Sequence, residues 1–192
     1  WKGGNASFES VPACVEARGL GVSVPAIGAV VTDIAYGGAY YCILPASRFG
    51  LDLFASPVAE IVAAAAMLTD TMRTARAITH PTEPDLGFLY GTIVTDEAGP
   101  EAESFNLCVF AERQIDRSPT GSGVTARMAL DHAKGLIPAG RRRSFRSITG
   151  GTFTGTVIGP VECPAAGAVT VAVAGTSHLA GEGSFVIEAD DP

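Results

Sequence analysis

The sequence has few charged residues, and they are not clustered as a nucleic-acid binder requires. Only 17% of the 192 residues are charged, and 13 Lys and Arg against 20 Asp and Glu leave a net charge of −7. Phosphate backbones are bound by clustered Lys and Arg, whereas the one basic run here is Arg141-Arg142-Arg143. We therefore expect no nucleic-acid partner. The 47% of apolar residues also excludes a disordered chain, which combines low hydrophobicity with high charge.

The sequence also lacks the spacings of a metal site or a disulfide framework. Its four cysteines and three histidines are scattered, and no CxxC pair occurs. We expect four reduced and mostly buried thiols, no metal and a cytoplasmic location. No apolar run approaches the roughly 20 residues of a membrane span, so no membrane partner is expected. Residues 1–4, Trp-Lys-Gly-Gly, resemble neither a signal peptide nor a Met start, and we expect the chain to begin within a longer protein.

The apolar pattern changes period along the chain, which predicts a mixture of strands and helices. Apolar residues at helical spacing predict one helix over residues 57–79 and a second over 121–134, with Gly135 ending the second. β-branched and aromatic runs between Gly and Pro residues predict the strands. These strands are expected near residues 22–24, 30–32, 40–44, 88–95, 106–110, 152–158, 169–174 and 184–188. The fold class is therefore α+β, without a linker or an internal repeat.

The stretch most indicative of chemistry is residues 116–123, Asp-Arg-Ser-Pro-Thr-Gly-Ser-Gly, between a predicted strand and a predicted helix. Backbone amides at a glycine-rich helix N-terminus form an anion site, which the helix dipole reinforces. A plainer interpretation is that the glycines only permit a tight turn. The spacing is neither a dinucleotide fingerprint nor a P-loop, so a carboxylate is the favoured anion.

Several blocks of the sequence resemble the proline racemase family. Residues 116–123 are similar to the family's Asp-Arg-Ser-Pro-Cys-Gly-Thr-Gly signature, with Thr120 in place of a catalytic cysteine. Residues 33–39, Asp-Ile-Ala-Tyr-Gly-Gly-Ala, resemble a second family block. Further similar blocks follow in the family's order over nearly the whole chain, at residues 10–13, 147–150, 153–155 and 190–192.

The resemblance implies a fold of two similar lobes, as in proline racemase and diaminopimelate epimerase, with the site between them. Each lobe is a curved sheet wrapped around a central helix. Of the two predicted helices, residues 121–134 are the better candidate for the central one, because their N-terminus carries the site. We expect residues 1–192 to form one lobe, truncated at both ends, whose final strands belong to the return segment toward the other lobe.

Thr120 narrows the activity that the resemblance implies. Racemases use two thiols, one to take and one to return the α-proton, and a thiol with a pKa of about 8.5 can do both. A threonine hydroxyl is too weak an acid to return a proton readily, but elimination after one proton abstraction remains possible. The variant signature resembles that of the trans-3-hydroxy-L-proline dehydratases of the family. A racemase or hydroxyproline epimerase is the first alternative, and a non-catalytic carboxylate-binding fragment is the second.

The resemblance also implies roles for individual residues. Asp116 would contact the ring nitrogen of the substrate, although it could simply pair with Arg117 or cap the turn. Gly121, Ser122 and Gly123 would bind the substrate carboxylate through their amides. Phe110 would line the pocket, unless it is an ordinary core residue, and Thr120 could act only as a helix cap. Arg127 and Asp131 are expected to form an i,i+4 pair on the helix.

The family's proton-abstracting cysteine lies in a Met-Cys-Gly-His-like motif that none of the four cysteines here matches. We expect that base in a segment preceding this one, and we expect the isolated chain to be inactive. The implied reaction needs neither a metal nor an organic cofactor. The expected partner is a small imino-acid substrate, and the oligomeric state is left open, a homodimer included.

Overall fold

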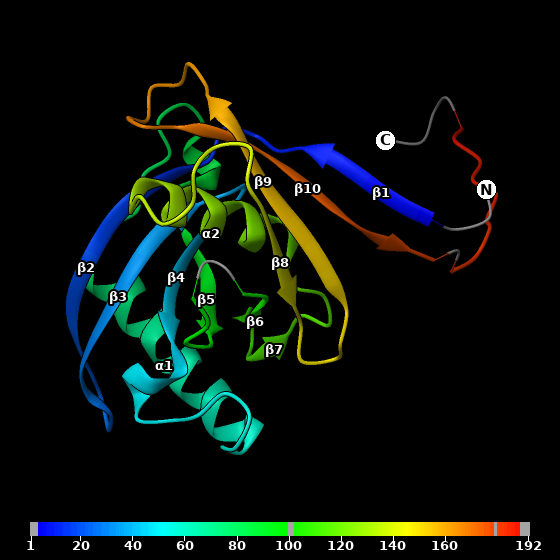
Figure 1. The fold of residues 1–192 in the computed structure, drawn as a ribbon. Coiled ribbons are helices and arrows are strands. Elements are labelled where there is room, and N and C mark those ends of the chain that lie inside the picture. The colour runs from blue at the N-terminus through cyan, green and yellow to red at the C-terminus, as the bar shows by residue number, and fades with distance from the viewer. Residues whose placement is uncertain (1–3, 100–101, 179, 189–192) are drawn as a thin grey trace.

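A computed structural model describes residues 4–99, 102–178 and 180–188 (Figure 1). It contains two α-helices, α1 (Val58–Ala75) and α2 (Gly121–Ala133), and the short 3-10 turns η1 (Ala46–Phe49) and η2 (Pro84–Leu86). The strands are β1 (Gly4–Glu9), β2 (Cys14–Val24), β3 (Gly28–Tyr36), β4 (Tyr40–Pro45), β5 (Leu89–Thr95), β6 (Ser104–Phe110), β7 (Gln114–Ile115), β8 (Arg142–Arg146), β9 (Thr152–Pro160) and β10 (Val169–Ser177).

The strands form one sheet in the order β1-β10-β9-β8-β6-β5-β4-β3-β2, with β7 paired to β6. Most neighbours are antiparallel, but β4 pairs with β5 and β6 pairs with β8 in parallel. Parallel neighbours require a long crossover connection, and a helix is its usual form. The two helices lie in these two connections, α1 between β4 and β5 and α2 between β6 and β8. The parallel pairs therefore account for the positions of both helices in the chain.

The sheet curves around α2 until its two halves meet (Figure 1). Ala13, just before β2, and Val169, at the start of β10, exchange two backbone hydrogen bonds of 2.8 Å. Nine of the 13 residues of α2 are buried as a result. This arrangement confirms the expected curved sheet with a central helix, and it confirms that the second predicted helix is the central one.

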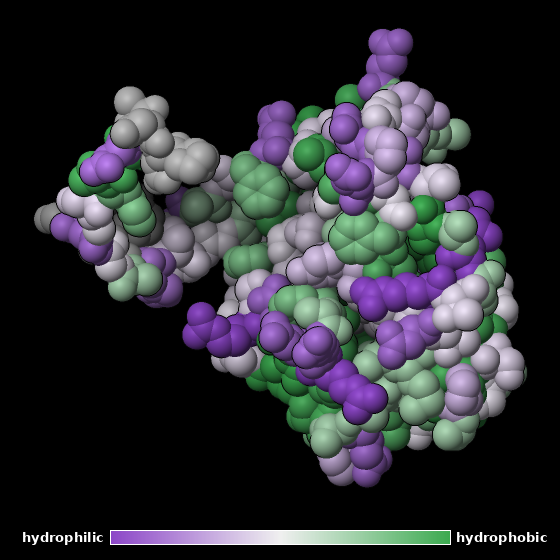
Figure 2. Space-filling model, turned by 180° about the vertical axis from the view of Figure 1, so that it is seen from behind, coloured by the Kyte–Doolittle hydropathy of each residue, from purple (hydrophilic) through white to green (hydrophobic). Residues whose placement is uncertain are grey.

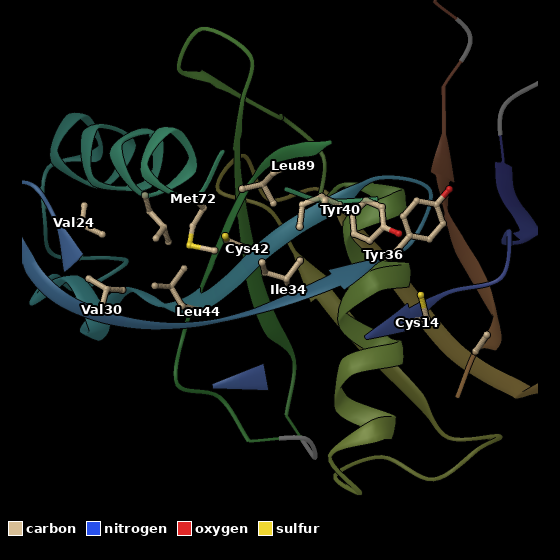
Figure 3. Close-up of a cluster of buried hydrophobic side chains, with 13 residues drawn as sticks. Cys14, Val24, Val30, Ile34, Tyr36, Tyr40, Cys42, Leu44, Met72 and Leu89 are labelled. Atoms are coloured by element: carbon tan, nitrogen blue, oxygen red, sulfur yellow. The ribbon is translucent and has the colours of Figure 1, made fainter. Parts of the chain in front are cut away.

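The strands alternate between the two helices because successive side chains point to opposite faces of a sheet. Tyr41 and Ile43 of β4 pack toward α2, in a cluster with Ala126 and Leu130. On the other face, a cluster that includes Met72 of α1 contains side chains of β3 and β4 (Figure 3), namely Ile34, Tyr36, Tyr40, Cys42 and Leu44. The central strands are thus buried on both faces, and α2 alone occupies the enclosed side.

Strand β1 and the end of β10 form a two-stranded arm (Figure 1), on the side where the space-filling view shows a part projecting from the body (Figure 2). All six residues of β1 are exposed, and their register pairs them with residues 172–177 of β10. Strand β1 therefore buries little apolar surface, and its backbone hydrogen bonds to β10 fix its direction. By contrast, Val169, Val171 and Val173 of β10 belong to the buried cluster that includes Val124 and Met128 of α2.

Two expectations about the strands need correction. The predicted strand at 184–188 is wrong: residues 180–188 have no regular structure, and Phe185 is 94% exposed. A strand there would need a neighbour, and none of the described strands pairs with it. Strands β1, β7 and β8 were not among the expected strands. Residues 190–192, one of the family-like blocks, lie outside the described residues. Neither helix of the described part has the length and hydropathy of a membrane span.

Candidate active site

Residues 116–120 form a turn between β7 and α2, and this turn borders a cavity of about 330 Å³. The cavity opens at the N-terminus of α2, on the enclosed side of the sheet. Strands β4, β5 and β6, the turn between β3 and β4, and the start of α2 supply the rest of its wall. Its lining consists of Gly38, Ala39, Tyr41, Tyr90, Cys108, Phe110, Asp116, Thr120, Gly121 and Ser122. The site signature and three strands that are distant in sequence therefore meet at one cavity.

The Asp116 carboxylate organises the turn. Its Oδ1 accepts a hydrogen bond of 2.8 Å from the Ser118 amide, and its Oδ2 accepts one of 2.9 Å from the Thr120 hydroxyl. The Ser118 hydroxyl in turn accepts the Thr120 amide at 3.0 Å. Of the two plain alternatives for its role, Asp116 does not pair with Arg117 but does cap the turn, and it also borders the cavity. Its carboxylate is therefore placed to meet a cation there.

Thr120 has an unusual backbone conformation, with φ 66° and ψ 105°. A β-branched residue at positive φ is a true outlier, and such strain costs on the order of 1–3 kcal/mol. Thr120 occupies the N-cap position of α2, and its carbonyl accepts the Val124 amide at 2.7 Å. Its hydroxyl, however, makes no capping hydrogen bond, because it donates to Asp116. The expectation of a capping hydroxyl is therefore wrong.

The first turn of α2 presents backbone amides beside the cavity. The Val124 amide makes the first hydrogen bond of the helix ladder, so the amides of Gly121, Ser122 and Gly123 precede it. Gly121 and Ser122 line the cavity, whereas Gly123 is buried, and a Cβ there would lie 2.6 Å from Ile93 Cδ1. Gly121 and Ser122 are thus placed to bind a carboxylate, with the positive end of the helix dipole behind them.

Three aromatic rings form the wall of the cavity opposite the turn. The Tyr90 ring stacks on Phe110 at 5.4 Å between centroids, and it meets Tyr41 edge-on at 5.6 Å. The Tyr41 hydroxyl lies 2.8 Å from Ser122 Oγ. Burial raises the pKa of Tyr41 above its ordinary value, so the phenol stays protonated at neutral pH. Phe110 was expected at the cavity from the sequence, but Tyr41 and Tyr90 were not.

Cys108 is a further lining residue that the sequence did not indicate. It is 1% exposed, and burial raises the pKa of its thiol to about 12. A thiol with that pKa is protonated at neutral pH and is a poor base. None of the other cysteines lines the cavity, and all four are free thiols. Among the described residues, no three His, Cys, Asp or Glu side chains gather into a group that could hold a metal ion.

The chain is similar to a set of known enzymes over almost its whole length. A family model described as proline racemase matches residues 2–192. Over 192 residues the chain is 47% identical to the trans-L-3-hydroxyproline dehydratase of Bos taurus and 47% identical to the trans-3-hydroxy-L-proline dehydratase of Homo sapiens. Each alignment covers 98% of this chain and 54% of the relative. The chain therefore spans about half the length of the curated relatives it matches.

A solved structure shares the fold. A hydroxyproline epimerase from Agrobacterium vitis, with bound trans-4-hydroxy-L-proline, superposes with a TM-score of 0.83 at 25% sequence identity. The match covers 91% of this chain and 50% of that chain. The curved sheet around α2 is therefore a fold that this chain shares with that epimerase.

Proposed function

The chain belongs to the proline racemase family, and on that premise we propose that the protein carrying it is a hydro-lyase acting on trans-3-hydroxy-L-proline. The observation that carries this proposal is the hydroxyl of Thr120 at the position of a thiol in the racemase signature. Racemisation needs a second group that returns a proton to the α-carbon, and a threonine hydroxyl is a far weaker acid than a thiol. Elimination needs no such return. The names of the bovine and human relatives support the same activity.

The site offers one group for each polar part of the substrate. The carboxylate fits the amides of Gly121 and Ser122 at the N-terminus of α2. The ring ammonium fits the carboxylate of Asp116, which borders the same cavity. The apolar ring carbons fit the wall formed by Tyr90 and Phe110. With both charged groups fixed, the 3-hydroxyl can be placed near Thr120, whose hydroxyl lies 2.9 Å from Asp116 Oδ2.

The reaction that follows is an elimination. A base takes the α-proton, the electron pair of that C–H bond forms a C2–C3 double bond, and the C3–O bond breaks. The departing hydroxide takes a proton from solvent and leaves as water, while the base gives up the α-proton to solvent. The resulting enamine tautomerises to the imine pyrroline-2-carboxylate. Thr120 would hydrogen-bond the departing oxygen by turning its one hydroxyl proton from Asp116 Oδ2 to that oxygen. These steps are proton transfers and bond cleavage, so the proposed reaction calls for neither a metal nor an organic cofactor.

The base is not assigned to a described residue of the cavity. Cys108 has the only thiol in the lining of the described cavity, and its pKa of about 12 leaves it protonated. We propose instead that the chain is one lobe of a two-lobed enzyme and that the base comes from the other lobe. The coverage of 54% of each curated relative supports this arrangement. Four free cysteines support a reducing compartment such as the cytoplasm.

A racemase or epimerase remains the second candidate. The observation in its favour is the shared fold with a hydroxyproline epimerase that holds trans-4-hydroxy-L-proline. That activity would exchange the α-hydrogen with solvent and invert the α-carbon, without release of water.

One experiment separates the two candidates. The whole protein carrying this chain is incubated in D₂O with trans-3-hydroxy-L-proline, trans-4-hydroxy-L-proline or L-proline. Dehydration is followed with a reagent that traps the cyclic imine, and racemisation by α-deuterium incorporation with chiral chromatography. We expect imine from the 3-hydroxy substrate and no inverted product from the other two. Inverted products without imine would show that the protein is an epimerase or racemase.

A further inference from the structure

Arg127, in the middle of α2, is buried without the carboxylate partner expected for it. Asp131 was predicted to pair with it, but Asp131 accepts a hydrogen bond of 2.6 Å from Arg143 instead. Arg127 Nη1 donates to Asn106 Oδ1 at 2.7 Å and to the Phe105 carbonyl at 3.0 Å. A buried cation is costly unless it is hydrogen-bonded, so these two neutral acceptors are important partners. The carboxamide of Asn106 is therefore oriented by a buried charge.

Asn106 connects this charge to the site. Its side chain is buried, and its Nδ2 donates a hydrogen bond of 3.1 Å to the carbonyl of Pro119. Because Oδ1 accepts from Arg127, the amide cannot flip without presenting Nδ2 to the guanidinium. The orientation that points Nδ2 at Pro119 is thus imposed by Arg127.

Pro119 directly precedes the strained residue of the turn. Thr120 holds φ at 66°, and a strained conformation persists only where the surroundings over-determine it. Fixing the Pro119 carbonyl fixes the peptide plane that enters Thr120. Asn106 therefore holds the backbone on the N-terminal side of Thr120, the N-cap residue of α2. The hydrogen bond to Asp116 holds the Thr120 side chain.

We propose that Asn106, oriented by Arg127, is a positioning residue that holds Thr120 in its positive-φ conformation. It thereby sets the place of the Thr120 hydroxyl and of the amides of Gly121 and Ser122. The consequence for activity rests on the proposed function, whereas the consequence for the conformation of Thr120 does not. Asn106 touches no substrate in this scheme, since it does not line the cavity.

The kinetic test replaces the amide nitrogen of the Asn106 side chain by an oxygen. Asn106→Asp keeps an oxygen for Arg127 but loses the donor to Pro119. We expect kcat/KM for trans-3-hydroxy-L-proline to fall about ten- to hundred-fold, because small misplacements of reacting groups have effects of this size. The control is Thr69→Val, which breaks a buried 2.8 Å hydrogen bond between Thr69 and Thr92 that does not border the cavity. It should lower stability and leave kcat/KM within about twofold. Equal falls in kcat/KM for Asn106→Asp and Thr69→Val would overturn the proposal. If Asn106→Asp does not fold, Asn106→Ala, which adds no charge, takes its place in the same measurement.

A double-mutant cycle tests the conformational part without any substrate. Glycine adopts positive φ without strain, so Thr120→Gly removes the need for a clamp. The shift in urea midpoint caused by Asn106→Ala should then be smaller in the Thr120→Gly background than in the wild type. Crystals of Asn106→Ala should also show Thr120 at negative φ. Equal shifts in both backgrounds, with φ unchanged, would overturn the proposal. A wild-type protein that neither dehydrates nor inverts any imino acid would refute the proposed function and leave this cycle intact.

Discussion

The hydroxyl oxygens of Tyr41 and Ser122 lie 2.8 Å apart, and this contact joins strand β4 to the first turn of α2. The neighbouring Tyr40 points to the opposite face of the sheet, where its hydroxyl donates to the Thr79 carbonyl at 3.2 Å. Two adjacent tyrosines thus make one hydrogen bond each, one beside the cavity and one remote from it. This pair allows the effect of the site contact to be separated from the effect of losing a buried hydroxyl.

Tyr41→Phe should lower kcat/KM for the proposed substrate about five-fold, since one neutral hydrogen bond contributes about 1 kcal/mol. The cause would be a less ordered Ser122 at the N-terminus of α2. Tyr40→Phe is the matched control and should lower thermal stability without changing the kinetics. The measurement is steady-state dehydration together with thermal unfolding of both variants. If both variants lose the same activity, Tyr41 has no specific role at the site.

Gly37 permits the close approach of α2 to the turn between β3 and β4. A Cβ built on Gly37 would lie 2.3 Å from the Ser122 carbonyl oxygen and 2.4 Å from the Ala126 amide nitrogen. Gly37→Ala must therefore displace the start of α2, at a cost of about 1–3 kcal/mol in the free energy of unfolding and with a raised KM. Gly21→Ala, where a Cβ meets nothing within 4 Å, should change neither quantity. Chemical denaturation gives the free energy of unfolding of both variants, and steady-state kinetics gives KM. An unchanged KM in Gly37→Ala would contradict carboxylate binding by the α2 amides.

Asp116→Asn should weaken binding of the ring ammonium, because the neutral amide keeps the size of the side chain but not its charge. Hydrogen bonds to charged groups contribute about 1.5–3 kcal/mol, which corresponds to a rise in KM of roughly 10- to 150-fold. Asp52→Asn is the control: Asp52 also accepts two hydrogen bonds, from the amides of Phe54 and Ala55, but lies away from the cavity. A normal KM in Asp116→Asn would mean that Asp116 serves only the turn.

The helices were predictable from local pattern, and their ends show where pattern fails. Helix α2 begins at the predicted residue and ends within one residue of the predicted end. Helix α1 was predicted to reach residue 79 but ends at Ala75, where Arg76 is already extended at φ −144°. Ile78 then packs into the cluster beneath β3 and β4. A long-range contact therefore overrides the helical pattern of the last four residues.

Only the part of the site that is contiguous in sequence was predictable. The turn at 116–123 could be recognised because a glycine-rich strand-to-helix junction has a chemical meaning by itself. Tyr41, Tyr90 and Cys108 reach the cavity from three different strands, and no local pattern orders those strands in the sheet. Likewise, no local pattern pairs the basic run at 141–143 with α2, yet Arg143 is buried against Asp131 at 2.6 Å. Such pairings depend on the sheet topology.

The buried thiols should make the fold lose stability at alkaline pH. Burial raises the pKa of Cys42 from its ordinary value near 9 to about 12. Between these values the unfolded chain has released the proton and the folded chain keeps it. The free energy of unfolding therefore falls as pH rises, by up to about 1.4 kcal/mol per pH unit for each such thiol.

Cys42→Ala should therefore show a shallower loss of stability between pH 9 and 12 than the wild type. Val30→Ala removes a side chain from the same cluster but no titrating group, so it should lower stability and keep the wild-type slope. Urea unfolding at several pH values measures both. Identical slopes for Cys42→Ala and the wild type would exclude Cys42 as a source of the alkaline instability.

Thr120 decides between one-base elimination and two-base racemisation. If a single base takes the α-proton, Thr120→Ala loses only the one hydrogen bond that this hydroxyl donates, at 2.9 Å to Asp116 in the structure and to the departing oxygen in the proposed reaction. A loss of about 1–2 kcal/mol corresponds to a roughly 5- to 30-fold fall in the dehydration rate. The measurement is imine formation by the whole protein, with Thr125→Ala as the control, because the Thr125 hydroxyl bonds to the Gly121 carbonyl within α2.

Thr120→Cys should produce a different outcome from Thr120→Ala. A thiol at this position restores the racemase signature, and a thiol can return a proton to the α-carbon near neutral pH. Slow deuterium exchange at the α-carbon with inversion should then become detectable on L-proline or trans-4-hydroxy-L-proline. Asp116→Ala should be more damaging than either change, because the ammonium loses its carboxylate in both reactions. If Thr120→Ala abolished dehydration completely, the hydroxyl of Thr120 would be an essential acid, and elimination by a single base would be the wrong mechanism.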